Sequence, residues 1–169
     1  IPTGSEISSA TFSEYYWLGT GRPDITGLKL SRVQPGATWV EGGGDKAATV
    51  NPWPTYNQRQ YGATAWGTAG ATGAADIDTS DTKTYNVTGG TDGFRTCDVT
   101  SFVNSWVNGG WTNNGMLMYG GYDAANTGSG YWFESCSELA TTANRPYMIV
   151  RYTAPSPPSP PSSPSASPS

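Results

Sequence analysis

The chain has 169 residues, with 9 Lys and Arg against 13 Asp and Glu, so its net charge is −4 and it lacks the basic excess of nucleic-acid-binding proteins. It contains no histidine, which excludes Ser-His-Asp and Cys-His nucleophile systems and histidine metal sites within this chain. No run of apolar residues approaches the ~20 that a membrane span needs.

The composition favours a secreted, all-β protein. Charged residues make up 13% of the chain, about half of the usual share. Glycine and aromatic residues are abundant, with 22 Gly and 7 Trp. Aromatic and β-branched residues between glycine-rich turns are typical of β-sheet proteins. The opening Ile1-Pro2-Thr3-Gly4 indicates a mature product or a piece of a longer chain. We therefore expect an extracellular location.

The first half of the chain predicts two strands and a long loop. Residues 7–17 alternate partially between apolar and polar side chains, and residues 28–33 alternate cleanly before Pro35-Gly36. Residues 42–75 consist mostly of Gly, Ala, Thr, Asn and Pro. That composition predicts a long loop region with interspersed aromatic residues and, at most, short strands.

Four aromatic residues in this loop region have few apolar neighbours to bury them: Trp53, Tyr56, Tyr61 and Trp66. Flat side chains of this kind stack on the faces of sugar rings, so these four are candidates for a carbohydrate-binding platform. The alternative is that they anchor the loop on the body of the domain. By contrast, Trp17, Trp106 and Trp132 lie in periodic segments and are predicted to be core, whereas Trp111 can belong to either class.

Two polar motifs follow the loop region. Asp76, Asp78 and Asp81 place three carboxylates within a short stretch, and hard oxygen ligands suit Ca²⁺. Because the Gly and terminal Glu of an EF-hand loop are missing, we interpret residues 76–81 as a solvated turn, with weak Ca²⁺ binding as the alternative. We predict no metal site and no cofactor. Asn86 begins the only N-x-Ser/Thr sequon and is a glycosylation candidate.

The second half predicts more strands and one helix. Strands are expected at residues 84–88, 94–98, 116–119, 131–135 and 147–152. In residues 98–109 the apolar positions 99, 102, 103, 106 and 107 lie on one face of a helix. Asp98 is the candidate N-cap and Gly109-Gly110 the stop. We interpret the helix as a structural plug at one end of a sandwich.

Cys97 and Cys136 are the only cysteines. In a secreted protein they predict one disulfide, the alternative being two buried free thiols. The bridge would close a loop of about forty residues, for which chain entropy gives ~3–4 kcal/mol.

The composition changes abruptly after Ala154. Residues 155–169 read PSPPSPPSSPSASPS and contain nothing that can build a core. Proline restricts φ, so this Ser/Pro segment is predicted to be a semi-rigid polyproline II helix of ~3.1 Å per residue. The chain thus divides into a domain, residues 1–154, and a C-terminal linker, residues 155–169.

Several motifs in the second half resemble one known family. They are Asp98-Val99-Thr100, Trp106, Asn113 to Met118, Phe133 to Glu138, and Arg145 to Tyr152. Their order is similar to that of the DNRLRE-type domain, an extracellular jelly-roll β-sandwich related to carbohydrate-binding modules. Residues 7–16 and 39–42 fit more loosely. The resemblance, over residues 5–153, implies a jelly-roll-like sandwich in a secreted setting and does not imply catalysis.

The chain departs from this family at its start. Such domains usually begin with further strands before the position that Ile7 matches here. A sandwich without them would leave a sheet edge or an apolar groove open, which a neighbouring copy could cover. The alternative is that the first strands were cut away or that the sheet is smaller.

The Ser/Pro segment resembles the repeats of hydroxyproline-rich glycoproteins of algal and plant walls. That resemblance implies hydroxylated prolines and sugars attached to hydroxyproline or serine. The candidate positions are Ser156, Pro157, Pro158, Ser159, Pro160, Pro161, Ser162, Ser163, Pro164, Ser165, Ser167 and Pro168.

Two functional hypotheses follow. The first is a non-catalytic structural repeat unit of an extracellular glycoprotein fibre, joined head to tail through the Ser/Pro segment, with neighbouring copies and attached glycans as partners. The second is a carbohydrate-binding module tethered by its linker to a polysaccharide-active enzyme. Neither hypothesis requires a catalytic residue in this chain.

Overall fold

The computed structural model describes residues 1–16, 24–40, 53–90, 92–123 and 142–157. Within these ranges strands dominate and a single α-helix is present. The predicted all-β sandwich with one short helix is therefore confirmed. None of the helices in these ranges is long and apolar enough to cross a membrane.

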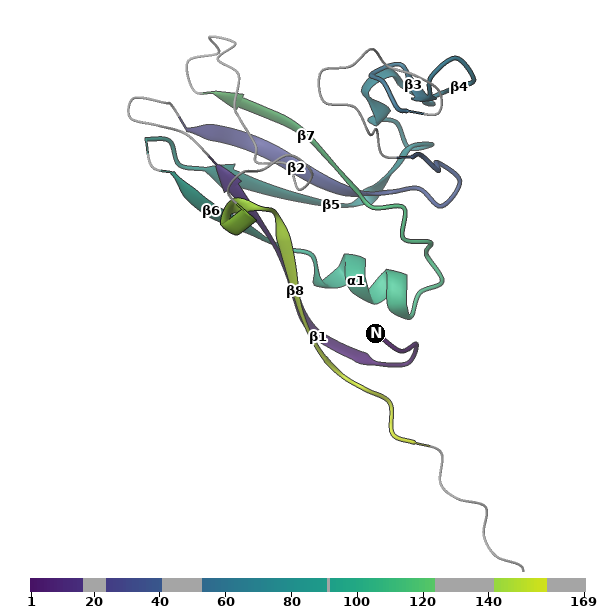
Figure 1. The fold of residues 1–169 in the computed structure, drawn as a ribbon, viewed down its shortest axis with the longest axis vertical. Helices are drawn as coiled ribbons and strands as arrows, with labels where there is room; N and C mark the ends of the chain where they lie inside the picture. Colours follow the sequence, from purple (N-terminus) through teal and green to yellow (C-terminus); the bar gives the residue numbers. More distant parts are fainter. Residues whose placement is uncertain (17–23, 41–52, 91, 124–141, 158–169) are drawn as a thin grey trace, which may run out of the picture.

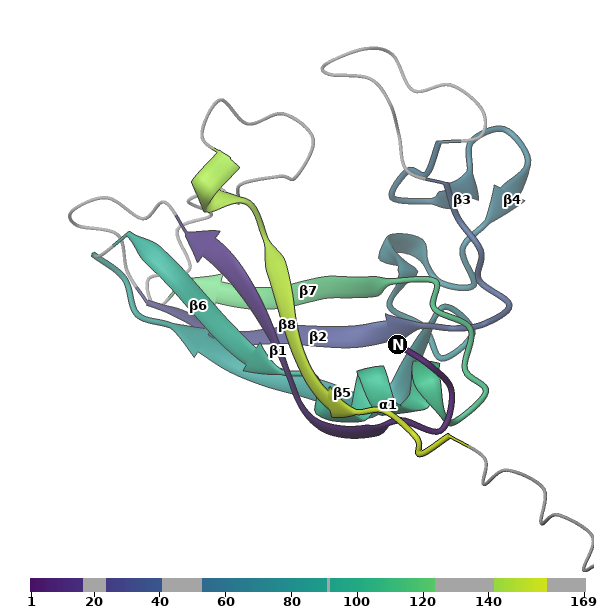
Figure 2. The same cartoon turned by 60° about the horizontal axis from the view of Figure 1, so that its bottom comes forward.

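Two antiparallel three-stranded sheets form the sandwich. The first has the order β6-β1-β8, with β6 at Gly93–Asp98, β1 at Glu6–Tyr16 and β8 at Tyr147–Thr153. The second has the order β5-β2-β7, with β5 at Ile77–Val87, β2 at Ile25–Val33 and β7 at Met116–Asp123. The two sheets lie over one another as separate layers (Figure 1, Figure 2). The predicted strand at 131–135 lies outside the described residues.

The core fills the space between the sheets. Its fully buried members include Ala10, Leu30, Val99, Phe102 and Val103, and partly buried Met and Val side chains of β7 and β8 pack against them. Period-two alternation explains the choice of residues on β1, because Cβ atoms on a strand point to opposite faces in turn. A second cluster, which includes Ile25 and Val87, continues the core toward the other end of β2.

A polar cluster bridges the sheets inside this core. Glu14 on β1 is only 6% exposed, and its Oε2 accepts hydrogen bonds of 3.0 Å from the hydroxyls of both Tyr16 and Tyr85. Burial raises the pKa of Glu14, although the two tyrosine hydrogen bonds act in the opposite direction. Burial and the neighbouring Glu14 also raise the pKa of Tyr85. The cluster satisfies polar groups that would otherwise be costly to bury.

The helix forms where the apolar periodicity predicts it. α1 spans Thr100–Val107 and buries Phe102 and Val103. The N-cap residue is Val99 and not the predicted Asp98. Asp98 lies one residue earlier, and its Oδ1 accepts hydrogen bonds from the backbone N–H and the hydroxyl of Thr100 at 2.8 and 2.6 Å. Those bonds hold the pKa of Asp98 below its ordinary value. Gly110, at φ 69°, turns the chain after the helix, as only glycine does without strain.

Residues 76–81 are not a solvated turn, and that interpretation is wrong. β5 begins at Ile77, and Asp76 and Asp78 are buried. Partners from other parts of the fold allow this burial. Backbone N–H groups donate to Asp76 and Arg32 donates to Asp78, so these carboxylates do not need water. In the described ranges no three His, Cys, Asp or Glu residues gather in a way that could hold a metal ion.

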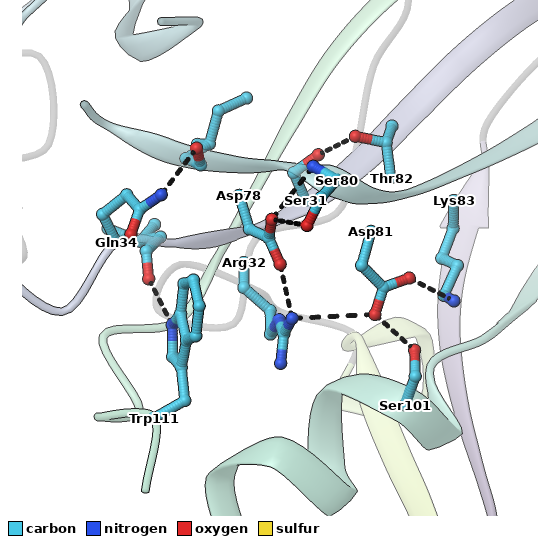
Figure 3. A network of polar contacts seen from close by, with 12 residues as sticks. Ser31, Arg32, Gln34, Asp78, Ser80, Asp81, Thr82, Lys83, Ser101 and Trp111 are labelled. Carbon is cyan, nitrogen blue, oxygen red and sulfur yellow. Dashed lines mark hydrogen bonds and ion pairs between the residues drawn. The ribbon is translucent and has the colours of Figure 1, made fainter. Parts of the chain in front are cut away.

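The partner of Asp78 is a buried arginine on the neighbouring strand (Figure 3). Arg32 is 5% exposed, and its Nη2 contacts Asp78 Oδ2 and lies 3.7 Å from Asp81 Oδ2. The guanidinium carbon lies 4.4 Å from the ring centroid of Trp111 and 5.4 Å from that of Phe102. The network therefore joins β2 and β5 to α1 and to the segment that follows it.

The Asp78 carboxylate has further donors. Its Oδ1 accepts hydrogen bonds from the backbone N–H and the hydroxyl of Ser80 at 3.0 and 2.6 Å. Burial acts to raise the pKa of Asp78, but the bonds from Ser80 and Arg32 outweigh it and leave the pKa below its ordinary value. Asp78 is therefore ionised at neutral pH and balances the buried arginine.

We predict that Asp78→Ala lowers the free energy of unfolding by about 3–5 kcal/mol, because it leaves the Arg32 charge buried without its main partner. Asp81→Ala is the matched control and should cost about 1 kcal/mol or less, since Asp81 is more exposed and pairs largely with Lys83. Urea unfolding of both variants measures the difference. Equal losses would contradict the central role of Asp78.

The same pair predicts a pH dependence. Because the folded pKa of Asp78 is lowered, its contribution is complete above the ordinary Asp pKa and is lost as the pH falls through the folded pKa. Urea unfolding of the unmodified chain between pH 7 and pH 2 should show stability falling on acidification. Asp78→Ala should flatten that slope; an unchanged slope would contradict the assignment.

Candidate functional site

An insert between β2 and β5 carries the aromatic residues that the sequence singles out. It contains the strands β3 (Gln58–Gln60) and β4 (Thr64–Ala65), paired as a small antiparallel sheet, and the 3₁₀-helix η1 (Ala69–Ala71). Figure 1 and Figure 2 show this small sheet standing off one end of the β5-β2-β7 sheet. The described part of the loop region thus has only short strands, as predicted.

Two groups fix the insert to the sandwich. Asp76, just before β5, is 3% exposed, and its carboxylate oxygens accept the N–H groups of Gly67 and Thr68 at 2.7 and 2.8 Å. On the other side, Arg59 donates a hydrogen bond to the carbonyl of Gly36. Asp76 is therefore a structural anchor.

A groove of about 440 Å³ lies between the insert and the ends of β2 and β7. We call it the aromatic groove, because three aromatic side chains line it: Trp39, Tyr56 and Trp66. The rest of its lining is largely apolar and comprises Val33, Pro54, Thr55, Gly70, Ala71, Asp76, Met116 and Leu117.

The rings of the aromatic groove are held in place by local contacts. The indole N–H of Trp66 donates to the Thr55 carbonyl at 2.9 Å, and that of Trp39 donates to the Asn114 carbonyl at 2.8 Å. Tyr56 is 73% exposed, yet its ring packs so closely on Gly70 that a Cβ there would lie 2.8 Å from Cε2. Rings fixed in this way lose little freedom when a ligand stacks on them.

Polar groups in the aromatic groove are mostly engaged within the protein. Both indole N–H groups donate to backbone carbonyls, and both Asp76 oxygens accept backbone N–H groups. The groove therefore offers ring faces and methyl groups and few hydrogen-bonding groups. It is suited to hold an uncharged ligand with an apolar face.

The structure brings together two of the four predicted platform residues, Tyr56 and Trp66. Trp53 and Tyr61 do not line the groove; the Trp53 carbonyl accepts the Tyr61 N–H at 2.9 Å within the insert. Trp39 is a groove residue that the sequence reasoning missed as a site. Its signal was a tryptophan just after the Pro35-Gly36 turn, outside any alternating segment.

A second apolar groove, of about 470 Å³, opens where β8 and the start of β7 meet α1. We call it the edge groove. It is lined by Ile1, Thr3, Val103, Trp106, Val107, Asn113, Gly115, Met116, Met148 and Val150. Trp106 packs on the core, as predicted, but its buried Nε1 has no hydrogen-bond partner. Apolar side chains next to the core therefore line an open groove.

The remaining predicted sites are only partly described. Cys97 is buried on β6 with a free thiol, whose pKa burial raises, and Cys136 lies outside the described residues, so the disulfide stays a prediction. Asn86 is exposed on β5, and its Oδ1 accepts the Gly27 N–H at 2.9 Å. Ser156 and Pro157 are exposed. The other candidate positions of the Ser/Pro segment, together with Trp17 and Trp132, lie outside the described residues.

Comparison with protein-family models, with curated proteins and with solved structures found no match in any of the three. The resemblance to the DNRLRE-type domain and to hydroxyproline-rich glycoproteins therefore stays a prediction.

We predict that Gly70→Ala displaces the Tyr56 ring, because a methyl group at Gly70 would overlap it. Gly62→Ala is the matched control: Gly62 has φ 74° and Gly70 φ 79°, but a Cβ at Gly62 meets nothing within 4 Å. Both variants should lose about 1–2 kcal/mol from the left-handed backbone. Only Gly70→Ala should shift the NMR signals of the Tyr56 ring, and unshifted signals would contradict the packing.

Proposed function

We propose that this chain is a non-catalytic structural repeat unit of an extracellular glycoprotein fibre, whose units are joined head to tail through the Ser/Pro segment. The edge groove is the observation that carries the proposal. It exposes Met148 and Val150 of β8 beside Trp106 and Val107 of α1. Apolar openings of this kind at a sheet edge favour association with further chain.

The outer side of β8 supports the same function. Tyr147 is 43% and Ile149 52% exposed, and β8 pairs with β1 on one side only within the described sheets. In a domain with so few charged residues, little opposes contact with another copy. A repeat unit in an array gains stability from such contacts with its neighbours.

The point at which the chain leaves the sandwich after β8 also suits units that are joined head to tail. Thr153 at the end of β8 pairs with Glu6 at the start of β1, and Pro155 lies near Gly4. The next residues, up to Pro157, are exposed and run away from the sandwich (Figure 1, Figure 2). The Ser/Pro segment thus begins at an end of the sandwich, and its first three residues lead outward.

Assembly of the purified chain tests the proposal. Sedimentation velocity and negative-stain electron microscopy should show polymers for the full chain and monomers after deletion of residues 155–169. Val150→Lys, which places a charge in the edge groove, should reduce assembly. Tyr61→Lys is its control, because Tyr61 is an exposed ring that lines neither groove, and it should assemble normally.

Because Val150 also packs on the core, circular dichroism should establish that Val150→Lys is folded. Thr3→Trp provides a second variant, since exposed Thr3 lines the edge groove without being part of the core. The larger side chain would obstruct the groove and should likewise reduce assembly. The proposal would be contradicted by a full chain that stays monomeric at all concentrations and whose serines carry no sugars in native material.

We predict that the native protein carries sugars on serine residues of the Ser/Pro segment and on Asn86. An extended proline-rich backbone presents its hydroxyl groups to solvent, where they can be modified. Intact-mass spectrometry should therefore give a mass above the 17.8 kDa of the bare chain. The bare mass in native material would refute glycosylation.

A carbohydrate-binding module is the second candidate. It is favoured by the convergence of Tyr56, Trp66 and Trp39 on one groove. Binding of the chain to soluble and insoluble polysaccharides tests it, and loss of binding in Tyr56→Ala but not in Tyr61→Ala would establish it.

A further inference from the structure

We propose that the aromatic groove of one copy binds the Ser/Pro segment of a second copy as a polyproline II helix, with a ridge of prolines on the rings and serines facing solvent. The inference rests on the proposed function, because it identifies the surface that receives the joining segment.

Over residues 155–165, two of the three faces of the segment are each uniform in composition at the polyproline II period. This helix has about three residues per turn, so every third residue lies on the same face. One face carries Pro155, Pro158, Pro161 and Pro164, and another carries Ser156, Ser159, Ser162 and Ser165. The segment is therefore predicted to have an apolar ridge beside a hydroxyl ridge.

The aromatic groove matches the proline ridge better than it matches a sugar. A sugar presents many hydroxyl groups, and those left without partners would cost free energy. The indole N–H groups of Trp39 and Trp66 and the carboxylate of Asp76 are already engaged. Proline has no N–H to satisfy, and its ring packs on aromatic faces.

The absence of side-chain charge in the segment and the small loss of conformational entropy on binding both favour the segment as the occupant. The segment contains only Pro, Ser and Ala, so it carries no side-chain charge into an apolar groove. The polyproline II shape that the sequence predicts for the segment would be set largely before binding, and contacts with Gly70 hold the Tyr56 ring in place. Little conformational freedom is lost on either side.

The geometry favours a second copy over the chain's own segment. The segment starts at β8 of the first sheet, whereas the groove lies at strand ends of the second sheet, at Val33, Met116 and Leu117. The chain runs away from the sandwich up to Pro157 (Figure 2). A stiff helix would have to reverse to reach its own groove, whereas its span of about 45 Å can reach a neighbour.

Titration of a fluorescent synthetic peptide, PSPPSPPSSPSASPS, with the full chain tests the proposal. Tyr56→Ala should weaken binding by about tenfold or more, since Tyr56 is an exposed ring at the centre of the contact. Tyr61→Ala is the matched control: Tyr61 is 45% exposed on the same insert but outside the groove, and its loss should change affinity less than about twofold.

Two peptide variants test the orientation. Replacing Pro158 and Pro161 by Ser removes the centre of the proline ridge and should abolish binding. Replacing Pro157 and Pro160 by Ser removes as many prolines from the third face, which carries neither ridge, and should retain most of the binding. Equal effects of the two peptides would overturn the assigned face.

Other results would overturn the inference in distinct ways. Oligosaccharide binding that depends on Tyr56, with no peptide binding, would assign the groove to carbohydrate. A Tyr56 ring signal that reports an occupied groove equally at all dilutions would assign the occupant to the same chain. If deletion of residues 155–169 abolishes assembly but Tyr56→Ala assembles normally, the proposed function stands and this inference fails. If no variant assembles but the peptide binds through Tyr56, the proposed function fails instead.

Discussion

Arg32 carries a positive charge into the interior of the sandwich, where an unpaired charge is very costly. Asp78 on the neighbouring strand balances that charge, and the rings of Trp111 and Phe102 cover the guanidinium. Since these partners come from β2, β5, α1 and the segment after the helix, they can meet only in one arrangement of those elements. Removing either partner would leave the other charge buried and unpaired, so the intact pair helps to hold these elements together at this end of the sandwich.

The aromatic groove depends on that arrangement. Val33, next to Arg32, lines the groove and its carbonyl accepts the indole N–H of Trp111 at 3.1 Å. Asp76, two residues before Asp78, holds the insert through backbone N–H groups. The buried ion pair and the groove thus depend on adjacent residues at the end of β2 and around the start of β5. A surface meant to receive another molecule gains from such a rigid base, because binding then requires little reorganisation.

The two grooves and the Ser/Pro segment are consistent with the proposed fibre unit. The grooves are largely apolar, the segment is uncharged, and none of them requires catalytic groups. Glycans on the serines would keep an assembled fibre hydrated while the apolar surfaces join its units. The low charge of the chain, which is unusual for an independent soluble domain, suits a protein whose partners are further copies of itself.

Local pattern determined much of the fold. Alternation identified β1 and β2, and the apolar face at positions 99, 102, 103, 106 and 107 identified α1, because both signals depend only on neighbouring residues in the chain. Composition likewise identified the Ser/Pro segment.

Only the tertiary structure determined whether the polar residues are buried and which of the loop aromatic residues come together. Asp76 and Asp78 looked like parts of a solvated turn because their partners, Gly67, Thr68 and Arg32, are remote in sequence or on another strand. In the same way, Trp39 joins Trp66 and Tyr56 through packing of the insert on the strand ends. Burial of a charge and convergence of rings depend on contacts between distant segments, and a local pattern carries no information about those contacts.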